Sequence, residues 1–243
     1  MVPVYNECDH IESLLKEWVT ALQDAVQSFE IVVINDGSSD GTGRVLDRLR
    51  HEIKTLRVIH QLNSGHGRAV RRGYELSRGK YILQLDSNGR YEPSDFLRLW
   101  EEKAQAHLVL AHRTHRLDSL IRRSFSSFLK RSAKWLFSIE LQDPDVAFRL
   151  FERKPVLHYL SGLSPSWDSV NLAMSIILKR EMPDRVKEIK IPFRKRPKGE
   201  TYIGPTALAK LASHYLQEMI RLRFTMVSIR ILTSSSTALP IEN

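Results

Sequence analysis

The chain of 243 residues has few of the features that mark cross-linked or membrane-spanning proteins. Its one cysteine, Cys8, excludes a disulfide framework and any zinc site made of cysteines. No apolar run reaches the roughly 18 residues that a membrane-spanning helix needs. The first residues lead directly into a turn, so we expect no secretory signal peptide. With 42% apolar and 27% charged residues, the composition is that of a globular protein with a sizeable core.

Negative charge is also scarce, with 28 acidic against 37 basic residues and a net charge of +9. The excess lies in two segments. Residues 112–134 hold seven Lys and Arg and one acid, residues 190–198 hold five Lys and Arg and no acid, and the rest of the chain nets −2. This pattern indicates an anionic partner, which is a nucleic acid, a phosphorylated ligand or a lipid surface. A solvated basic face explains either segment alone equally well.

Short apolar runs alternate with segments of helical spacing through the first half of the chain. The predicted strands cover residues 30–35, 56–60, 80–85 and 107–111, and the predicted helices cover residues 10–29, 42–53, 64–77 and 94–106. This alternation predicts an α/β fold with a mostly parallel sheet flanked by helices. Ligands of such sheets bind beyond the carboxyl ends of the strands. Asp36 and Asp86 each follow a predicted strand directly, so we expect both in one site.

The second half has longer helical segments and one further predicted strand. Helical spacing covers residues 119–138, 168–181 and 205–224, and residues 186–192 form an apolar run. The last of these helical segments mixes basic and apolar side chains. Two placements stay open for it, which are packing on the core and lying in a lipid interface. Residues 233–243 are mostly small or polar, and we expect them to be disordered.

Five short motifs follow one another along this pattern. They occupy residues 3–7 (Pro-Val-Tyr-Asn-Glu), 32–42, 63–75, 85–93 and 143–151 (Asp-Pro-Asp-Val-Ala-Phe-Arg-Leu-Phe). In this order and spacing they resemble the family 2 glycosyltransferases with a GT-A fold, and most closely the polyprenyl-phosphate sugar transferases. The resemblance covers residues 2–203. It implies a Rossmann-like GT-A domain over residues 1–203, followed by a C-terminal amphipathic helical segment over 204–232 and the tail over 233–243.

The resemblance also implies an activity. It implies an inverting hexosyltransferase that moves a sugar from a nucleotide-sugar donor to a polyprenyl phosphate of the dolichyl type. It implies a cytoplasmic protein of the cell envelope, in peripheral contact with the cytoplasmic face of a membrane or held there by a membrane partner. Two alternatives stay open: a catalytically silent relative that binds nucleotide sugars or lipid phosphates, and a transferase acting on a saccharide hydroxyl. A nucleic-acid-binding protein is disfavoured, because aromatic residues are 8% of the chain and do not form stacking platforms along the basic segments.

The nucleotide site is expected around the turn of residues 36–41. Carboxylates there can accept hydrogen bonds from a base or ribose, and glycine lets the backbone approach a ligand. Alternatively, Asp36 and Asp40 only cap the next helix. In the family, the counterpart of Asp36 contacts the base. The resemblance assigns nucleotide binding to Pro3, Tyr5, Glu7, Asp36, Asp86 and Ser87.

A second turn, at residues 64–68, carries two glycines before a predicted helix. Backbone N–H groups at such a helix start can approach a phosphate. The same residues are also compatible with a flexible turn that binds nothing.

Residues 86–90 depart from the family at the site of its divalent cation. The family has Asp-x-Asp, often followed two positions on by Gln, and these side chains hold the cation against the donor diphosphate. Here Asp86 keeps the first position, Asn88 replaces the second Asp, and Arg90 stands in place of Gln. Mg²⁺ and Mn²⁺ favour carboxylate oxygens, and arginine is not a ligand. Three outcomes stay open: weak metal binding through Asp86 and Asn88, a metal-independent site in which Arg90 stabilises the diphosphate, and an inactive site.

The segment of residues 143–151 supplies the remaining expected catalytic residues. Asp143 and Arg149 match family positions that border the donor sugar and the acceptor, or they form an internal ion pair that braces the chain. The full expected catalytic set is Asp86, Asn88, Arg90, Asp143 and Arg149.

The two basic segments acquire roles from the resemblance. Arg113, Arg123 and Arg131 are the expected ligands of the acceptor phosphate, and Arg196 belongs to a basic loop that closes over the donor diphosphate. A lipid phosphate is already anionic near neutral pH and needs no strong base. A hydroxyl acceptor would need a carboxylate base, for which Asp145 and Asp168 are the candidates.

Overall fold

The computed structural model describes residues 1–113, 120–192 and 205–236, and its strands form two sheets. Strands β1 (Val2–Val4), β2 (Ile31–Asp36) and β3 (Leu56–Gln61) pair in parallel. The second sheet has the order β4-β6-β5-β7, from β4 (Tyr81–Gln84), β5 (Leu108–Arg113), β6 (Arg149–Glu152) and β7 (Val186–Ile191). Because β5 and β7 are also parallel, the predicted mostly parallel sheet is confirmed.

Backbone hydrogen bonds join the two sheets at β1 and β4. The Leu85 N–H donates to the Met1 carbonyl at 3.1 Å, and the Met1 amino group donates to the Leu83 carbonyl at 2.6 Å. The end of β1 pairs with the end of β2, and the chain that follows β4 runs on beside β1. This brings the loops that follow these three strands to one edge of the molecule.

Two strands, β1 and β6, are not among those that the sequence pattern predicts, and β6 changes the topology. It pairs antiparallel with both β4 and β5, and it inserts between them. The strand is only four residues long and begins with an arginine, so it lacks the apolar run that identifies its neighbours.

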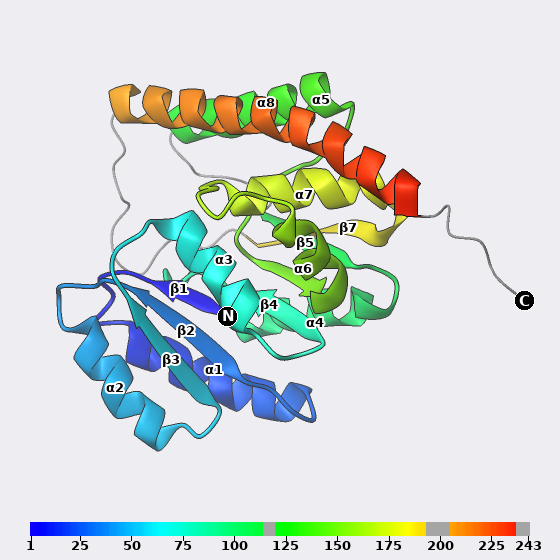
Figure 1. Ribbon diagram of the computed structural model, residues 1–243. Coiled ribbons are helices and arrows are strands. Elements are labelled where there is room, and N and C mark those ends of the chain that lie inside the picture. Colours follow the sequence, from blue (N-terminus) through cyan, green and yellow to red (C-terminus); the bar gives the residue numbers. More distant parts are fainter. Residues whose placement is uncertain (114–119, 193–204, 237–243) are drawn as a thin grey trace, which may run out of the picture.

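Eight α-helices of the described residues cover these strands (Figure 1). They are α1 (Ile11–Ala25), α2 (Thr42–Glu52), α3 (His66–Leu76), α4 (Pro93–Glu101), α5 (Leu120–Phe137), α6 (Arg153–Ser161), α7 (Val170–Glu181) and α8 (Pro205–Ser236), with 3-10 turns at Glu102–Ala104 and Pro183–Arg185. In Figure 1, α1 and α2 lie below the first sheet and α3 lies above it. Helices α5 and α8 lie side by side as an outer layer on α7. The short helix α6 is the one helix that the sequence pattern misses.

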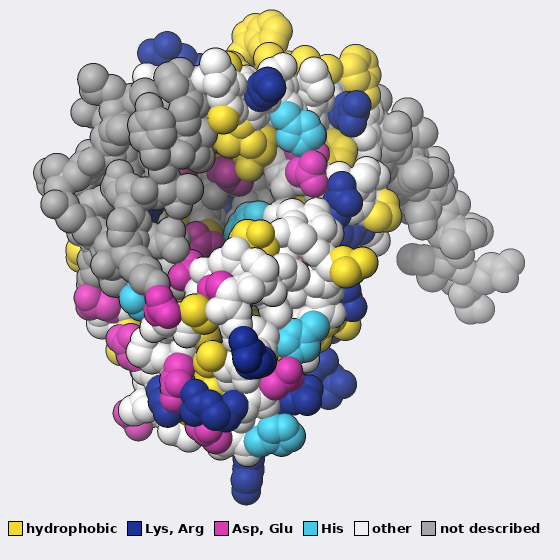
Figure 2. Space-filling view, turned by 90° about the vertical axis from the view of Figure 1, so that its left-hand side faces the viewer, with side chains coloured by type: hydrophobic (Ala, Val, Ile, Leu, Met, Phe, Trp, Pro, Cys, Tyr) yellow, Lys and Arg dark blue, Asp and Glu magenta, His cyan; other side chains and the backbone are white. Residues whose placement is uncertain are grey.

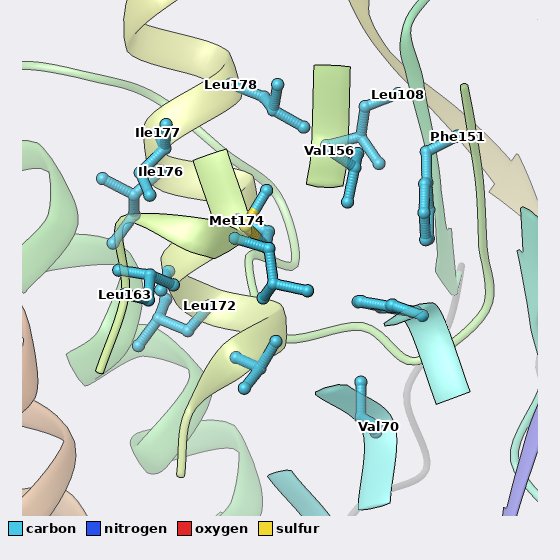
Figure 3. Packing of buried hydrophobic residues seen from close by; sticks show 14 of the residues in the cluster. Val70, Leu108, Phe151, Val156, Leu163, Leu172, Met174, Ile176, Ile177 and Leu178 are labelled. Carbon is cyan, nitrogen blue, oxygen red and sulfur yellow. The ribbon is translucent and has the colours of Figure 1, made fainter. Parts of the chain in front are cut away.

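Helix α7 is the centre of the larger hydrophobic core. All nine residues from Val170 to Leu178 are buried, which is the pattern of a helix enclosed on every side. Figure 3 shows Leu172, Met174 and Ile176 of this helix among the residues of the cluster, together with Val70 of α3. A second cluster, built around α1, α2 and α4, fills the other face of the strands.

Helix α8 packs on the core with one face, and it extends further along the chain than expected. Its Met219, Leu222 and Met226 are buried in the core cluster, so its inner face packs on the protein. The helix continues to Ser236, four residues into the segment expected to be disordered from residue 233. The physical reason is that residues 206–239 contain no glycine or proline to end the helix. Residues 237–243 lie outside the described part of the chain.

Candidate active site

A polar cleft opens where β1, β2, β3 and β4 end. Its volume is about 380 Å³. Its lining residues are Pro3, Val4, Tyr5, Glu7, Asp36, Asn63, Gly65, His66, Ala69, Asp86, Ser87 and Asn88. All six residues expected to bind the nucleotide are therefore brought together in one cleft. Figure 2 faces this end of the molecule and shows a hollow with acidic and histidine side chains on its walls.

Asp36 ties the end of β2 to the loop that follows β3. It is buried, and its Oδ1 accepts hydrogen bonds from the Ser64 N–H at 2.9 Å and from Gln61 Nε2 at 2.7 Å. Its Oδ2 accepts the Gly65 N–H at 3.0 Å. These bonds fix the carboxylate at the floor of the cleft, so Asp36 does not serve as a cap of α2.

Asp40, and not Asp36, accepts a hydrogen bond from the start of α2. It accepts the backbone N–H of Thr42 at 3.0 Å at the start of α2, and the N–H of Cys8 at 3.1 Å. Desolvation would raise the pKa of the Asp40 carboxyl, but the hydrogen bonds from Thr42 and Cys8 outweigh it and lower this pKa to about 2. Asp40 therefore holds the motif of residues 3–7 against the start of α2.

Glycine is required at both positions 65 and 67 of the second turn, for a different structural reason at each. Gly65 has a φ of +95°, which a residue with a side chain rarely adopts. Gly67 has ordinary backbone angles, but a Cβ there would lie 1.8 Å from the carbonyl oxygen of Asp168. The turn is thus a packed junction between α3 and the start of α7, and it presents Gly65 and His66 to the cleft.

Asp86 and Asn88 lie in the cleft at the end of β4, and Arg90 does not line it. The Asn88 amide donates to Asp86 Oδ2 at 3.1 Å, and Asn88 Oδ1 accepts the backbone N–H of Arg90 at 3.2 Å. Arg90 is 7% exposed. Among the described residues, the loop therefore offers the cleft a carboxylate and an amide, with the arginine side chain largely covered.

Arg149 lies inside the protein, 1% exposed. Its Nε donates to the Val146 carbonyl at 2.8 Å, and its Nη1 donates to the Asn171 carbonyl at 2.9 Å and to Ser175 Oγ at 3.1 Å. Burial lowers the pKa of this guanidinium. Arg149 therefore braces β6 against α7 through backbone carbonyls. Asp143 is also buried, and neither residue lines the cleft of the described residues.

The four arginines expected to bind phosphate are described only in part. Arg131 is exposed on α5. Arg113 ends β5 and Arg123 lies in α5, but their side chains, and the whole of Arg196, lie outside the described residues.

Asn63 and His66 line the cleft although they were not among the expected site residues. Their position in the glycine turn of residues 63–67 was the signal that could have identified them.

Asp145, one of the two candidate bases, has a raised pKa. Desolvation by burial raises the pKa of its carboxyl from 3.8 to about 6, against the lowering effect of Arg149 and His66. The Tyr215 hydroxyl donates to Asp145 Oδ2 at 3.3 Å. Asp145 therefore contacts α8 through Tyr215 and is close enough to the cleft residue His66 to feel its charge.

Asp168 belongs to an ion-pair cluster with α8. His214 Nε2 lies 3.1 Å from Asp168 Oδ2, and Arg68 Nε lies 3.6 Å from Asp168 Oδ1. Glu218 accepts the backbone N–H groups of Asp168 and Ser169, both at 2.8 Å. The ligand atoms of Asp168, His214 and Glu218 lie within 4.8 Å of one another. Since both oxygens of Glu218 already satisfy the start of α7, the cluster holds α8, α7 and α3 together.

The fold is that of a GT-A glycosyltransferase. The model of glycosyl transferase family 2 matches residues 1–158, and the chain belongs to this family. It is 32% identical over 186 residues to a dolichyl-phosphate beta-glucosyltransferase of Dictyostelium discoideum, covering 65% of this chain and 56% of that protein. It is 26% identical over 214 residues to an undecaprenyl-phosphate 4-deoxy-4-formamido-L-arabinose transferase of Aeromonas hydrophila, covering 87% of this chain and 64% of that protein. The chain thus spans less than two thirds of the length of either relative.

The comparison with solved structures supports the fold alone. Glucosyl-3-phosphoglycerate synthase from Mycobacterium tuberculosis, in complex with Mn²⁺ and uridine-diphosphate-glucose, superposes with a TM-score of 0.63 at 17% identity. The match covers 93% of this chain and 76% of that one.

Within the described residues, no helix combines the length and the apolar character needed to cross a bilayer.

Proposed function

We propose that the chain transfers a hexose from a nucleotide-sugar donor to a polyprenyl phosphate, with inversion at the anomeric carbon. The observation that carries the proposal is the single cleft that gathers Asp36, Asp86 and the glycine turn at the carboxyl ends of the strands. The relatives that act on dolichyl and undecaprenyl phosphates support the acceptor class. Because a polyprenyl phosphate is a lipid that resides in a bilayer, we also propose peripheral contact of the chain with the cytoplasmic face of a membrane.

The reaction needs alignment and charge stabilisation more than a base. An oxygen of the acceptor phosphate forms a bond to the anomeric carbon while the bond to the donor diphosphate breaks, and nucleoside diphosphate leaves. The acceptor is anionic near pH 7, so no proton has to be removed. Asp36 holds the turn of Ser64 and Gly65 in place by accepting their backbone N–H groups. The N–H groups that follow, in the first turn of α3, are the ones that would bind a diphosphate.

A divalent cation fits the residues at the end of β4. Asp86 supplies one carboxylate and Asn88 one amide oxygen, and Mg²⁺ is commonly bound by one or two carboxylates together with substrate phosphates. When bound, the cation would neutralise charge on the leaving diphosphate. Asp86 and Asn88 would hold it, whereas the buried Arg90 would support the loop through its backbone.

One observation favours a second acceptor class, a saccharide hydroxyl. Asp145 has a carboxyl pKa raised to about 6 by burial, and it lies close to His66 of the cleft. A carboxyl that titrates near the working pH is the property of a general base. Transfer to a hydroxyl would use Asp145 to accept the hydroxyl proton.

Incubation with labelled nucleotide-sugar donors and matched acceptors tests the proposal. We expect transfer to a polyprenyl phosphate and none to the corresponding polyprenol or to saccharides, and loss of this transfer in Asp86→Ala. Transfer to saccharides that is lost in Asp145→Asn would establish the second acceptor class. Donor binding without transfer to any acceptor would identify a catalytically silent relative and contradict both candidate activities.

A further inference from the structure

An apolar pocket lies between helices α1 and α4 and the ends of β1 and β4 that are remote from the cleft. Its volume is about 160 Å³. Helix α1 lines it with Leu15, Trp18 and Leu22, and α4 lines it with Phe96 and Trp100. The remaining wall consists mainly of residues at the beginnings of β1, β2 and β4. The pocket therefore opens within the second hydrophobic cluster, the one built around α1, α2 and α4.

This pocket is separate from the candidate active-site cleft. Within the described residues, the two hollows share no lining residue. Strand β1 runs from Val2 at the pocket to Pro3 and Val4 at the cleft, and Leu85 at the pocket is followed directly by Asp86 at the cleft. The pocket is thus a second site at the other ends of the same strands.

Two polar side chains of the pocket wall are already bonded within the protein. Glu30 Oε2 accepts a hydrogen bond from Arg57 Nη1 at 2.6 Å, and Glu30 Oε1 accepts the backbone N–H of Arg78 at 2.5 Å. The Ser77 hydroxyl donates to the Gly73 carbonyl at 2.7 Å. Since most of the other lining side chains are aliphatic or aromatic, the pocket favours an uncharged and mostly apolar molecule.

Trp18 is the side chain of the pocket wall that has an unmet polar group. It is 3% exposed, and its indole N–H has no hydrogen-bond acceptor among the described residues. A buried donor without an acceptor is costly, and such groups are uncommon in native proteins. A ligand with an acceptor oxygen would satisfy this N–H after a small turn of the indole ring toward the pocket.

The volume of the pocket sets the size of its ligand. An apolar cavity of about 150 Å³ in another protein binds benzene, so one ring with a short substituent fits here. We propose that the pocket binds an uncharged molecule of this size that carries one hydrogen-bond acceptor, and that the Trp18 indole N–H donates to it. The inference does not depend on the proposed function, because the pocket and the cleft are separate.

Titration with acetophenone, which has one ring and one carbonyl oxygen, tests the site. The indole N–H signals of the four tryptophans are followed by heteronuclear NMR, and the signal that is absent in Trp18→Phe belongs to Trp18. We expect this signal to shift in a saturable manner, with one acetophenone bound per chain.

α-Methylstyrene has nearly the same shape as acetophenone but no acceptor oxygen. The wild type should prefer acetophenone over α-methylstyrene roughly fivefold more strongly than Trp18→Phe does, because that variant lacks the donor. This ratio of affinities isolates the hydrogen bond from any general change in the shape of the pocket.

Leu22→Trp should fill the pocket and weaken acetophenone binding roughly tenfold or more. Leu97→Trp is the matched control, because Leu97 is 46% exposed on α4 and lines neither the pocket nor the cleft. Leu97→Trp should bind acetophenone with the affinity of the wild type, and so should the cleft variant Asp36→Asn.

Three results would overturn the proposal. The first is the absence of a saturable shift of the Trp18 signal, and the second is unchanged acetophenone affinity in Leu22→Trp. The third is loss of binding in Asp36→Asn, which would place acetophenone in the cleft. If Leu22→Trp does not fold, as judged by its melting temperature, the comparison with Trp18→Phe still decides, because an equal preference for the two probes in both proteins would contradict the proposed hydrogen bond.

Discussion

The side-chain amide of Asn88 donates a hydrogen bond to Asp86 Oδ2 at 3.1 Å in the candidate active-site cleft. This contact occupies the place where the family has two carboxylates. A neutral amide next to a carboxylate needs no counterion to be stable, whereas two carboxylates at this distance repel each other. The pair therefore explains how the loop stays ordered with one acid fewer. If the proposed cation binds, we expect it to bind mainly when the donor diphosphate supplies further oxygens.

Restoring the second acid should make the loop depend on a cation. In Asn88→Asp, the lost hydrogen bond and the new repulsion should cost on the order of 1 kcal/mol, which lowers the melting temperature by about 2–4 °C. Mn²⁺ should then raise the melting temperature of Asn88→Asp more than that of the wild type. Asn88→Ala, which removes the donor without adding charge, is the control and should gain no Mn²⁺ response. An equal effect of Mn²⁺ on all three proteins would contradict this interpretation.

Asp36 should contribute to stability as well as to the site. In Asp36→Asn, the amide NH₂ faces either the Gly65 N–H or the donors from Ser64 and Gln61, so one donor loses its acceptor. We expect a loss of about 1–3 kcal/mol in the free energy of unfolding, measured by urea denaturation. Asp24→Asn, at an exposed position of α1, should stay within about 0.5 kcal/mol of the wild type.

Arg149 should behave as a structural residue. A lysine at this position cannot reach the carbonyls of Val146 and Asn171 together with Ser175 Oγ, because it lacks the planar fork of donors. We expect Arg149→Lys to lose about 2–4 kcal/mol of unfolding free energy. Arg50→Lys, on the exposed face of α2, should be near neutral. A changed KM for the donor with unchanged stability would instead place Arg149 at the substrate.

The raised carboxyl pKa of Asp145 should make the stability of the protein depend on pH. Its carboxyl pKa is raised by burial from 3.8 to about 6, so between these values the folded protein binds the proton more tightly than the unfolded chain. Stability from this group is therefore present at low pH and falls as the pH rises from about 4 to 6. Asp145→Asn, which keeps an oxygen acceptor for Tyr215, should be more stable than the wild type at pH 7 by on the order of 2 kcal/mol.

Urea denaturation at a series of pH values between 4 and 7 measures this difference. The gap between Asp145→Asn and the wild type should grow across this range and then level off. Asp184→Asn, at an exposed position of the 3-10 turn before β7, should show a constant and small difference. A gap for Asp145→Asn that does not change with pH would show that Asp145 keeps an ordinary carboxyl pKa.

The sequence pattern predicted the scaffold of the cleft because that scaffold depends on simple periodicity. Buried strands read as continuous apolar runs, and Asp36 and Asp86 follow two of them directly. The same logic fails for β6, whose buried arginine is satisfied partly by the Asn171 carbonyl, which is distant in sequence. The burial of Arg90 and the burial that raises the pKa of Asp145 also depend on tertiary packing that no local pattern shows. The length of α8 was underestimated because small polar residues resemble a tail although they can continue a helix.

Calorimetric titration with UDP-, GDP- and dTDP-sugars, with and without Mn²⁺, tests the central claim most directly. We predict that one of these donors binds the wild type at one site per chain, and that the control Asp24→Asn binds it with equal affinity. Asp36→Asn should bind it at least roughly tenfold more weakly, because a loss of about 1.4 kcal/mol in binding free energy corresponds to that factor. Binding of the donor to Asp36→Asn with unchanged affinity, or the absence of binding by any nucleotide sugar, would contradict the assignment of this cleft to a nucleotide-sugar donor.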